Sequence, residues 1–179
     1  MRALAERHGT TYAEELGVRV ARNTPAPLFQ LLCAALLRSA RISFHVAVDA
    51  ARALWANGWT TPDKMARSTW GERAYALNMA GYARHDEHTS SLLGETCKLL
   101  LDRYGGDLRK LRAEAGHEPA RERELLKRFP GIGDVGVDIF FREVQAAWEE
   151  LVPFADTRAL RAAKRLGYPG PPGSSSASS

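Results

Sequence analysis

The sequence has few of the features that mark metalloproteins, redox proteins and membrane proteins. Its only cysteines are Cys33 and Cys97, and neither belongs to a Cys-x-x-Cys or Cys/His pair. A structural zinc or an iron–sulfur cluster therefore has no ligand set, and both thiols are expected to be buried in apolar helices. No apolar run reaches membrane-spanning length and the N-terminus has no signal-peptide core, so we expect a soluble, cytoplasmic protein.

Charge and composition set mild limits on function. The chain has 25 basic and 21 acidic side chains, a net charge of +4, which permits nucleic-acid binding without requiring it. With 45% apolar residues, the 179-residue chain can form one domain or two small lobes that share a core. No internal repeat is present. The run PGPPGSSSASS predicts a disordered tail over residues 169–179.

Apolar residues recur at helical spacing along almost the whole chain, and no segment shows the alternation of a strand. Thr61-Pro62-Asp63 combines a capping hydroxyl with proline at the first helical position, which is a strong helix start. The pattern predicts an all-α protein of about ten helices. They cover 1–8, 11–16, 24–39, 43–57, a segment from 61, 70–79, 85–104, 107–115, 119–129, 134–148 and 157–166.

The segment LLKRFPGIGDVG, residues 125–136, joins two of these helices. Its glycines allow a tight turn and a close approach of the backbone to a partner. The helix that begins at Asp134 directs its N-terminal amides outward, and such an end binds a phosphate without reading bases. Asp134 itself repels a phosphate, and Lys127 and Arg128 offset its charge. The ordinary alternative is a plain interhelical turn, which Pro-Gly serves equally well.

Asp156 begins the last predicted helix, TRALRAAKRL. Aspartate is a preferred N-cap residue, and capping alone stabilises a helix by about 1 kcal/mol. The capping amides would also keep this carboxylate ionised. An ionised carboxylate stabilises a neighbouring positive charge and can orient or deprotonate a water molecule. Capping and catalysis are therefore compatible roles for Asp156.

Four segments resemble the endonuclease III-like, helix-hairpin-helix (HhH-GPD) superfamily of DNA glycosylases, and they occur in the order found in that superfamily. Residues 27–43 and 81–84 are similar to its two DNA-probing turns, residues 125–137 to its hairpin, and residues 154–158 to the segment with its essential aspartate. The resemblance implies a two-lobed fold with DNA in the cleft between the lobes. It implies one domain over residues 1–168, with the hairpin at 119–148, and it makes Asp156 the catalytic residue.

The resemblance also assigns contacts with DNA. A glycosylase rotates its target nucleotide out of the stack, and a side chain such as Tyr82 or Arg41 must fill the gap. The ordinary alternatives are a solvated arginine and a packed tyrosine, and Arg38 is a weaker candidate. The residues expected to contact DNA are Gly131, Ile132, Gly133, Lys127, Arg128, Arg41, Tyr82 and Arg84.

The departures from the family pattern narrow the expected activity. Members with lyase activity carry a lysine where this chain has Val135, which cannot form a Schiff base. The glutamate of adenine-excising relatives falls at Ala34, the glutamine of the first probing turn at about Ala40, and the four cluster-binding cysteines are absent. These differences favour a monofunctional base-excision repair glycosylase without a metal or cofactor. A monovalent cation at the hairpin, common in relatives, is compatible with the resemblance.

Other functions remain open at this stage. The expected partner is double-stranded DNA that contains a lesion, bound by a monomer away from any membrane. One alternative is a catalytically inactive protein of the same fold that binds damaged DNA. A second is a bifunctional glycosylase/lyase whose amine is Lys127 or Lys164, and a third is a helical bundle unrelated to DNA.

Several further residues have a simple structural interpretation. His85 and His88 share a helix face but lack a metal-binding motif, which is typical of a solvated helix start. Tryptophans 55, 59 and 70 are better placed for packing than for a base pocket. The alternation of Glu122 and Glu124 with arginines predicts an ordinary salt-bridged helix face.

Overall fold

The computed structural model describes residues 10–167, and every regular element in that range is a helix. The predicted all-α fold is thus confirmed, while the predicted helix 1–8 and the tail 169–179 lie outside the described residues. The elements are α2 Tyr12–Glu15, η1 Val20–Arg22, α3 Pro25–Ser39, α4 Phe44–Ala56, α5 Pro62–Arg67, α6 Trp70–Met79, α7 Asp86–Tyr104, α8 Leu108–Glu114, α9 Pro119–Leu126, α10 Asp134–Val144, η2 Glu149–Leu151 and α11 Thr157–Arg165.

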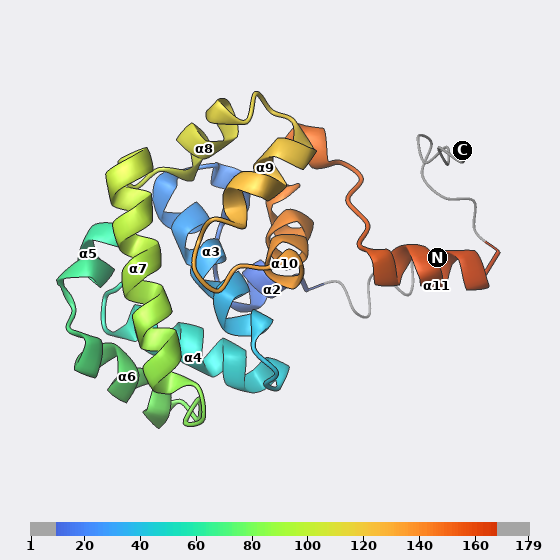
Figure 1. The fold of residues 1–179 in the computed structure, drawn as a ribbon. Helices are drawn as coiled ribbons and strands as arrows, with labels where there is room; N and C mark the ends of the chain where they lie inside the picture. Colours follow the sequence, from blue (N-terminus) through green and yellow to red (C-terminus); the bar gives the residue numbers. More distant parts are fainter. Residues whose placement is uncertain (1–9, 168–179) are drawn as a thin grey trace.

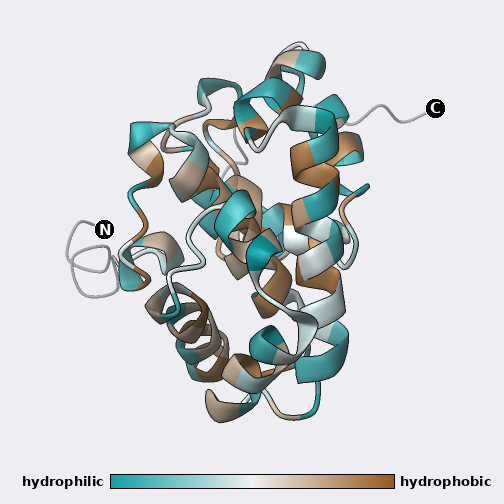
Figure 2. Ribbon diagram, turned by 90° about the vertical axis from the view of Figure 1, so that its left-hand side faces the viewer, coloured by the Kyte–Doolittle hydropathy of each residue, from teal (hydrophilic) through white to brown (hydrophobic). Residues whose placement is uncertain are grey.

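Helix α3 is the centre of the fold (Figure 1). Its side chains from Leu28 to Leu37, Gln30 excepted, are buried, and it contacts α4, α8 and α10. A helix that is apolar nearly all round is stable only when neighbours cover it on every side. Each leucine removed from water in this way contributes about 1.5–3 kcal/mol. Figure 2 shows the same pattern throughout the molecule, with hydrophobic residues on helix sides that face other helices.

Two groups of helices surround α3. The long helix α7 packs against α5 and α6, and α6 in turn contacts α4. On another side α10 packs against α3, and α9 contacts both α8 and α10. One continuous hydrophobic core extends through both groups. A two-lobed arrangement with a DNA cleft stays a prediction. In residues 10–167, no helix combines the length and apolar character needed to cross a bilayer.

Helix starts follow the sequence signals closely, but some helices end earlier than predicted: α9, for example, ends at Leu126 and not at residue 129. Ser43 and Thr61 accept hydrogen bonds from the backbone amides of Val46 and Lys64, as expected of N-caps. Helix α10, however, ends at Val144 and not at Trp148. The indole of Trp148 is fully buried and donates a hydrogen bond to the side chain of Asn23 at 3.2 Å. The backbone of Trp148 is extended, with φ −111° and ψ 99°, although its amide still donates a hydrogen bond to the carbonyl of Val144 at 2.9 Å.

The last described segment leaves the body of the protein. After η2, residues 152–156 run outward, and α11 lies apart from the other helices (Figure 1). Most of its described side chains are exposed, including Leu160 at 39% and Leu166 at 73%. The position of Asp156 at the start of α11 therefore depends on how residues 152–156 are attached to the core.

Candidate functional site

The hairpin turn between α9 and α10 requires glycine at Gly131. Its φ angle is +81°, a left-handed conformation that side chains with a Cβ rarely adopt. A Cβ at this position would also lie 2.7 Å from Cδ1 of Leu92. Gly133, the N-cap of α10, has no atom within 4 Å of a Cβ built on it, so this side of the turn is open. The turn can therefore approach a ligand closely at Gly133.

Two apolar side chains anchor the turn in the core. Phe129 is 1% exposed and Ile132 is 4% exposed. The side chain of Ile132 therefore cannot make the DNA contact predicted for it, because it packs inside the protein. Its backbone remains part of the turn, which is where a phosphate contact of this kind forms.

The cations near the hairpin are paired with acids of α10. Lys127 Nζ lies 3.0 Å from Asp134 Oδ1, and Arg123 bridges Asp134 at 3.5 Å and Asp138 at 2.5 Å. The hydrogen bond from Lys127 lowers the pKa of Asp134 below its ordinary value. The predicted compensation of Asp134 by Lys127 is confirmed, and Arg123 contributes to it. Arg128 is exposed.

Asp156 is the N-cap of α11, so that part of the prediction is confirmed. Its Oδ1 accepts a hydrogen bond from the backbone amide of Ala159 at 2.8 Å. Its Oδ2 forms an ion pair with Nη2 of Arg142, a residue of α10. The side chain of Asp156 is 13% exposed and that of Arg142 is 50% exposed. The carboxylate is thus held from two directions at the edge of the protein. The catalytic role of Asp156 stays a prediction.

The segment before Asp156 is attached to the same helix. The ring of Phe154 packs edge-on against Phe141 of α10, with 5.5 Å between ring centroids. The backbone amide of Phe154 donates a hydrogen bond to Gln145 Oε1 at 3.0 Å. The guanidinium of Arg123, which pairs with the acids at the hairpin end of α10, lies 5.3 Å from the centre of the Phe141 ring. Helix α10 therefore carries the hairpin at its start and the attachment of the Asp156 segment near its end.

Charged residues follow one face of α10. Asp134, Asp138 and Arg142 are spaced four residues apart, so they lie on the same side of the helix. The two acids pair with Lys127 and Arg123, and Arg142 pairs with Asp156. Two groups of ion pairs thus lie on this face of α10, one at the hairpin and one at the candidate catalytic carboxylate.

The predicted role of Tyr82 as a wedge between bases is wrong. Its side chain is 1% exposed, and its hydroxyl donates a hydrogen bond to the backbone carbonyl of Leu37 at 2.9 Å. Leu37 lies in the last turn of α3, where carbonyls have no partner within the helix, so the hydroxyl satisfies one of them. Burial raises the pKa of Tyr82. Tyr82 is a packing residue, which was the ordinary alternative.

The arginines of the two predicted probing turns differ in exposure. Arg41 and Arg84 are exposed, and their contact with DNA stays a prediction. Arg38 is half-buried, with Nη1 3.5 Å from the carbonyl of Ile42. Among the positions that depart from the family pattern, Val135 is 62% exposed in the first turn of α10 and Ala34 is fully buried in α3.

A buried charge cluster lies where α8, α9 and η2 meet. Arg112 holds Glu150 through two hydrogen bonds of 2.6 Å, and His117 Nδ1 is 3.8 Å from the same carboxylate. Glu122 is fully buried, and its carboxyl lies beside that of Glu150, to which it donates a hydrogen bond when protonated. The predicted salt-bridged face is therefore wrong for Glu122, although Glu124 does pair with Arg121 at 3.2 Å.

The two acids of this cluster titrate far apart. Burial, followed by the neighbouring Glu150, raises the pKa of Glu122 to about 8. The Arg112 guanidinium lowers the pKa of Glu150 to about 2. Such separation is typical of acid–base pairs in active sites. Glu122 is inaccessible to a substrate, however, so we interpret the cluster as structural. Sequence reasoning missed it because its members come from three elements.

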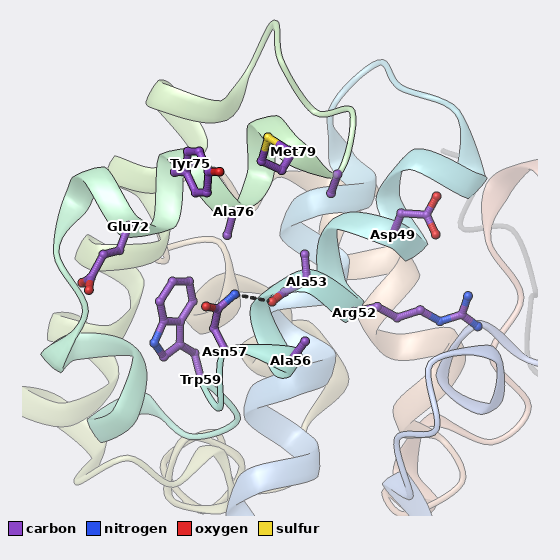
Figure 3. A pocket seen from close by; sticks show the side chains of 11 residues that line it. Asp49, Arg52, Ala53, Ala56, Asn57, Trp59, Glu72, Tyr75, Ala76 and Met79 are labelled. Carbon is purple, nitrogen blue, oxygen red and sulfur yellow. Dashed lines mark hydrogen bonds between the residues drawn. The ribbon is translucent and has the colours of Figure 1, made fainter.

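A surface hollow of about 690 Å³ lies between α4 and α6 (Figure 3). Trp59 and Tyr75 give it aromatic walls, and small alanines form much of its lining. None of the predicted site residues borders it. Of the other tryptophans, Trp70 donates a hydrogen bond to Ser91 at 3.0 Å and Trp55 is half-buried. The lining residues are Asp49, Arg52, Ala53, Ala56, Asn57, Trp59, Glu72, Tyr75, Ala76, Met79 and Ala80.

Metal-ligating side chains do not gather in the part of the chain that the structure describes. Residues 10–167 contain no group of three or more His, Cys, Asp or Glu side chains that could hold a metal ion. Cys33 and Cys97 are free and buried, as predicted, and burial raises the pKa of both thiols. His85 packs edge-on against Tyr82, with 6.1 Å between ring centroids.

Comparison with known proteins adds no assignment: no family model, curated protein or solved structure matches this chain. The interpretation of the site therefore rests on its own geometry and on the motifs of the sequence.

Proposed function

We propose that this protein is a DNA glycosylase that hydrolyses the N-glycosidic bond of a damaged or mispaired base in duplex DNA. The observation that carries the proposal is the arrangement on α10. One helix begins at an open glycine turn suited to a phosphate and, near its other end, holds the aspartate that caps α11. A single rigid element can therefore fix both the DNA backbone and a carboxylate.

In this proposal the hairpin provides the anchor. The backbone amides at Gly131 and Gly133, with the start of α10, bind a phosphate of the DNA strand, because helix N-termini attract anions. Exposed Arg128 adds positive charge beside the turn. Arg41 and Arg84 contact the duplex from the probing turns and help to open the stack. The contacts at the backbone fix the position of the sugar, not the identity of the base.

Asp156 supplies the chemistry. Departure of the base leaves positive charge on the deoxyribose, and an ionised carboxylate beside that sugar stabilises the charge. The same carboxylate orients or deprotonates the water molecule that attacks the sugar. The hydrogen bond from the Ala159 amide favours the ionised form. No step of this hydrolysis uses a metal or an organic cofactor.

The product strand should remain uncut. Lyase chemistry needs an amine that forms a Schiff base with the sugar, and the exposed Val135 at the corresponding position has none. Lys127, the nearest alternative amine in sequence, is held in an ion pair with Asp134.

The test is base release from a panel of duplexes that each contain one lesion, resolved with and without hot alkali. We expect cleavage only after alkali, and a loss on the order of 10²–10⁴-fold in Asp156→Asn. Asp107→Asn is the matched control, because Asp107 also caps a helix, also pairs with an arginine and is 15% exposed. Borohydride trapping would expose a lyase amine.

A second candidate function is binding of damaged DNA without catalysis. The ion pair of Asp156 with Arg142 favours it, since a neutralised carboxylate stabilises a sugar cation poorly. Tight, salt-dependent duplex binding with no base release from any lesion, unchanged in Asp156→Asn, would establish this alternative. Absence of salt-dependent duplex binding would exclude both candidates.

A further inference from the structure

The ion pair between Arg142 and Asp156 conflicts with the chemistry proposed for Asp156. A guanidinium beside the carboxylate cancels much of the negative potential that a sugar cation needs. Arg142 would also repel that cation directly. If Asp156 acts on DNA, Arg142 must therefore leave Asp156 before the base departs.

The surroundings of Arg142 allow such a change. Its side chain is 50% exposed, whereas that of Asp156 is 13% exposed. A ligand therefore reaches Arg142 more readily, and the arginine is the partner that can move. Asp156 keeps its hydrogen bond from the Ala159 amide when Arg142 moves. A capping amide of this kind favours the ionised form of a carboxylate.

The substrate itself brings a competitor. A nucleotide within a DNA strand has a phosphate on each side of its sugar, so a deoxyribose placed at Asp156 delivers phosphates next to Arg142. A guanidinium matches phosphate geometry as well as it matches a carboxylate and binds it by paired hydrogen bonds. Lys127 and Arg123, farther along the same face of α10, are also held by acids in the free protein.

We propose that Arg142 masks Asp156 in the free protein and passes to a DNA phosphate when the duplex binds, which exposes the carboxylate to the sugar. This inference rests on the proposed function. It adds a control of that function, because the carboxylate becomes available only where a strand is seated on α10. Arg142 is then a DNA-binding residue as well as a mask.

The first measurement is the salt dependence of duplex binding by Arg142→Gln. Loss of one phosphate contact should reduce the slope of log K against log salt by about 0.9. Arg142→Lys, which keeps the charge, should retain the wild-type slope. Arg52→Gln is the matched control, because Arg52 is 52% exposed and also pairs with a carboxylate, that of Glu15. An unchanged slope in Arg142→Gln would overturn the proposal.

The second measurement separates a mask from a permanent support. In single-turnover base release, Arg142→Gln should act mainly on duplex binding: the duplex concentration that gives half of the maximal rate should rise by more than the maximal rate falls. The opposite result, in which the maximal rate falls by more than that concentration rises, would show that Arg142 must stay on Asp156, and the proposal would be wrong. Circular dichroism establishes that the variant is folded.

The third measurement does not need activity. NMR titration of the Asp156 carboxyl in the free protein should show a higher pKa in Arg142→Gln than in the wild type, because an opposite charge is removed. An equal pKa would contradict masking. Failure of the proposed function has a different signature: the wild type would release no base from any duplex, while the binding slope and the titration still report on Arg142.

Discussion

Two arginine–carboxylate pairs attach the last described segment to the core, and they differ in almost every respect. Arg112 holds Glu150 through two hydrogen bonds, with side-chain exposures of 16% and 12%. Arg142 reaches Asp156 through one nitrogen and is 50% exposed. The first pair is enclosed by Trp148, over whose ring Arg112 lies at 5.5 Å. The second lies at the surface beside the start of α11.

The difference separates a structural pair from one that a ligand can open. Removing one partner of an enclosed pair leaves an uncompensated charge away from water, so such a pair is hard to break. A surface pair contributes little to stability, because water and salt replace the lost partner. A competing phosphate can therefore take Arg142 from Asp156 at small cost, whereas no anion reaches Arg112. The same two residue types thus serve two purposes.

The largest expected effect is on stability, in Arg112→Met compared with Arg142→Met. Arg112→Met should lower the free energy of unfolding by about 3 kcal/mol, because the ionised Glu150 then lies away from water without its guanidinium partner. Arg142→Met should lose less than about 1 kcal/mol. Urea unfolding at pH 7 measures both values. Equal losses of unfolding free energy would mean that the Arg142 pair is as important for stability as the Arg112 pair.

The next effect concerns Glu122 and depends on pH. Its folded pKa of about 8 lies above the ordinary 4.5, so the folded state holds a proton that the unfolded state has released between these values. Glu122 therefore makes its full contribution to the free energy of unfolding below pH 4.5, and that contribution is lost as pH rises to 8. Glu122→Gln should remove that fall and be more stable than the wild type at pH 8.

Glu150 gives the opposite dependence, which serves as an internal check. Its folded pKa is lowered to about 2, so its contribution is present above pH 4.5 and is lost as pH falls towards 2. That loss at low pH should occur both in the wild type and in Glu122→Gln. Glu124→Gln, on the exposed side of the same helix, should show the wild-type pH profile throughout. Thermal unfolding from pH 3 to 9 tests these expectations together.

A smaller effect is expected for the N-cap at Asp156. Asp156→Ala should weaken α11 by about 1 kcal/mol, whereas Asp156→Asn, which can still cap, should change it by less than about 0.5 kcal/mol. Amide hydrogen exchange in α11 measures this local stability. If Asp156→Asn melts α11 as far as Asp156→Ala does, a loss of activity in Asp156→Asn would no longer report on catalysis alone.

The smallest stability effect is expected for Val135→Lys, within about 0.5 kcal/mol, because Val135 is 62% exposed. This variant places a lysine at the position where lyases of the family that the sequence resembles carry theirs. We expect it to give a borohydride-trapped adduct with abasic DNA, which the wild type does not give. Val152→Lys, at a position that is 59% exposed, is the control. An adduct with the wild type would reveal another reactive amine.

The sequence predicted the helices and their starts well, because these depend on local signals. Thr61 and Asp156 cap helices as expected, since the capping hydrogen bond reaches only three residues along the chain. Gly131 takes the left-handed conformation that a tight turn after proline requires. Burial of the two cysteines also followed from their apolar helical surroundings.

The residues that sequence reasoning placed wrongly are those whose partners lie far along the chain. Tyr82 is a core residue because it meets the end of α3, 45 positions earlier. Glu122 is buried because α8 and η2 close over α9, although its neighbours in sequence are those of a solvated face. Local charge pattern cannot reveal such closure, since it depends on which helix faces meet.

The amino-acid sequence by itself determined the all-α fold, the glycine turn and the capped aspartate, because each follows from short-range backbone preferences and hydrophobic spacing. Only the tertiary structure decided that Arg142 faces Asp156 and that Arg112 encloses Glu150. These pairings depend on the packing of α10 and α8 against the returning chain, and electrostatic partners are set by distance in space.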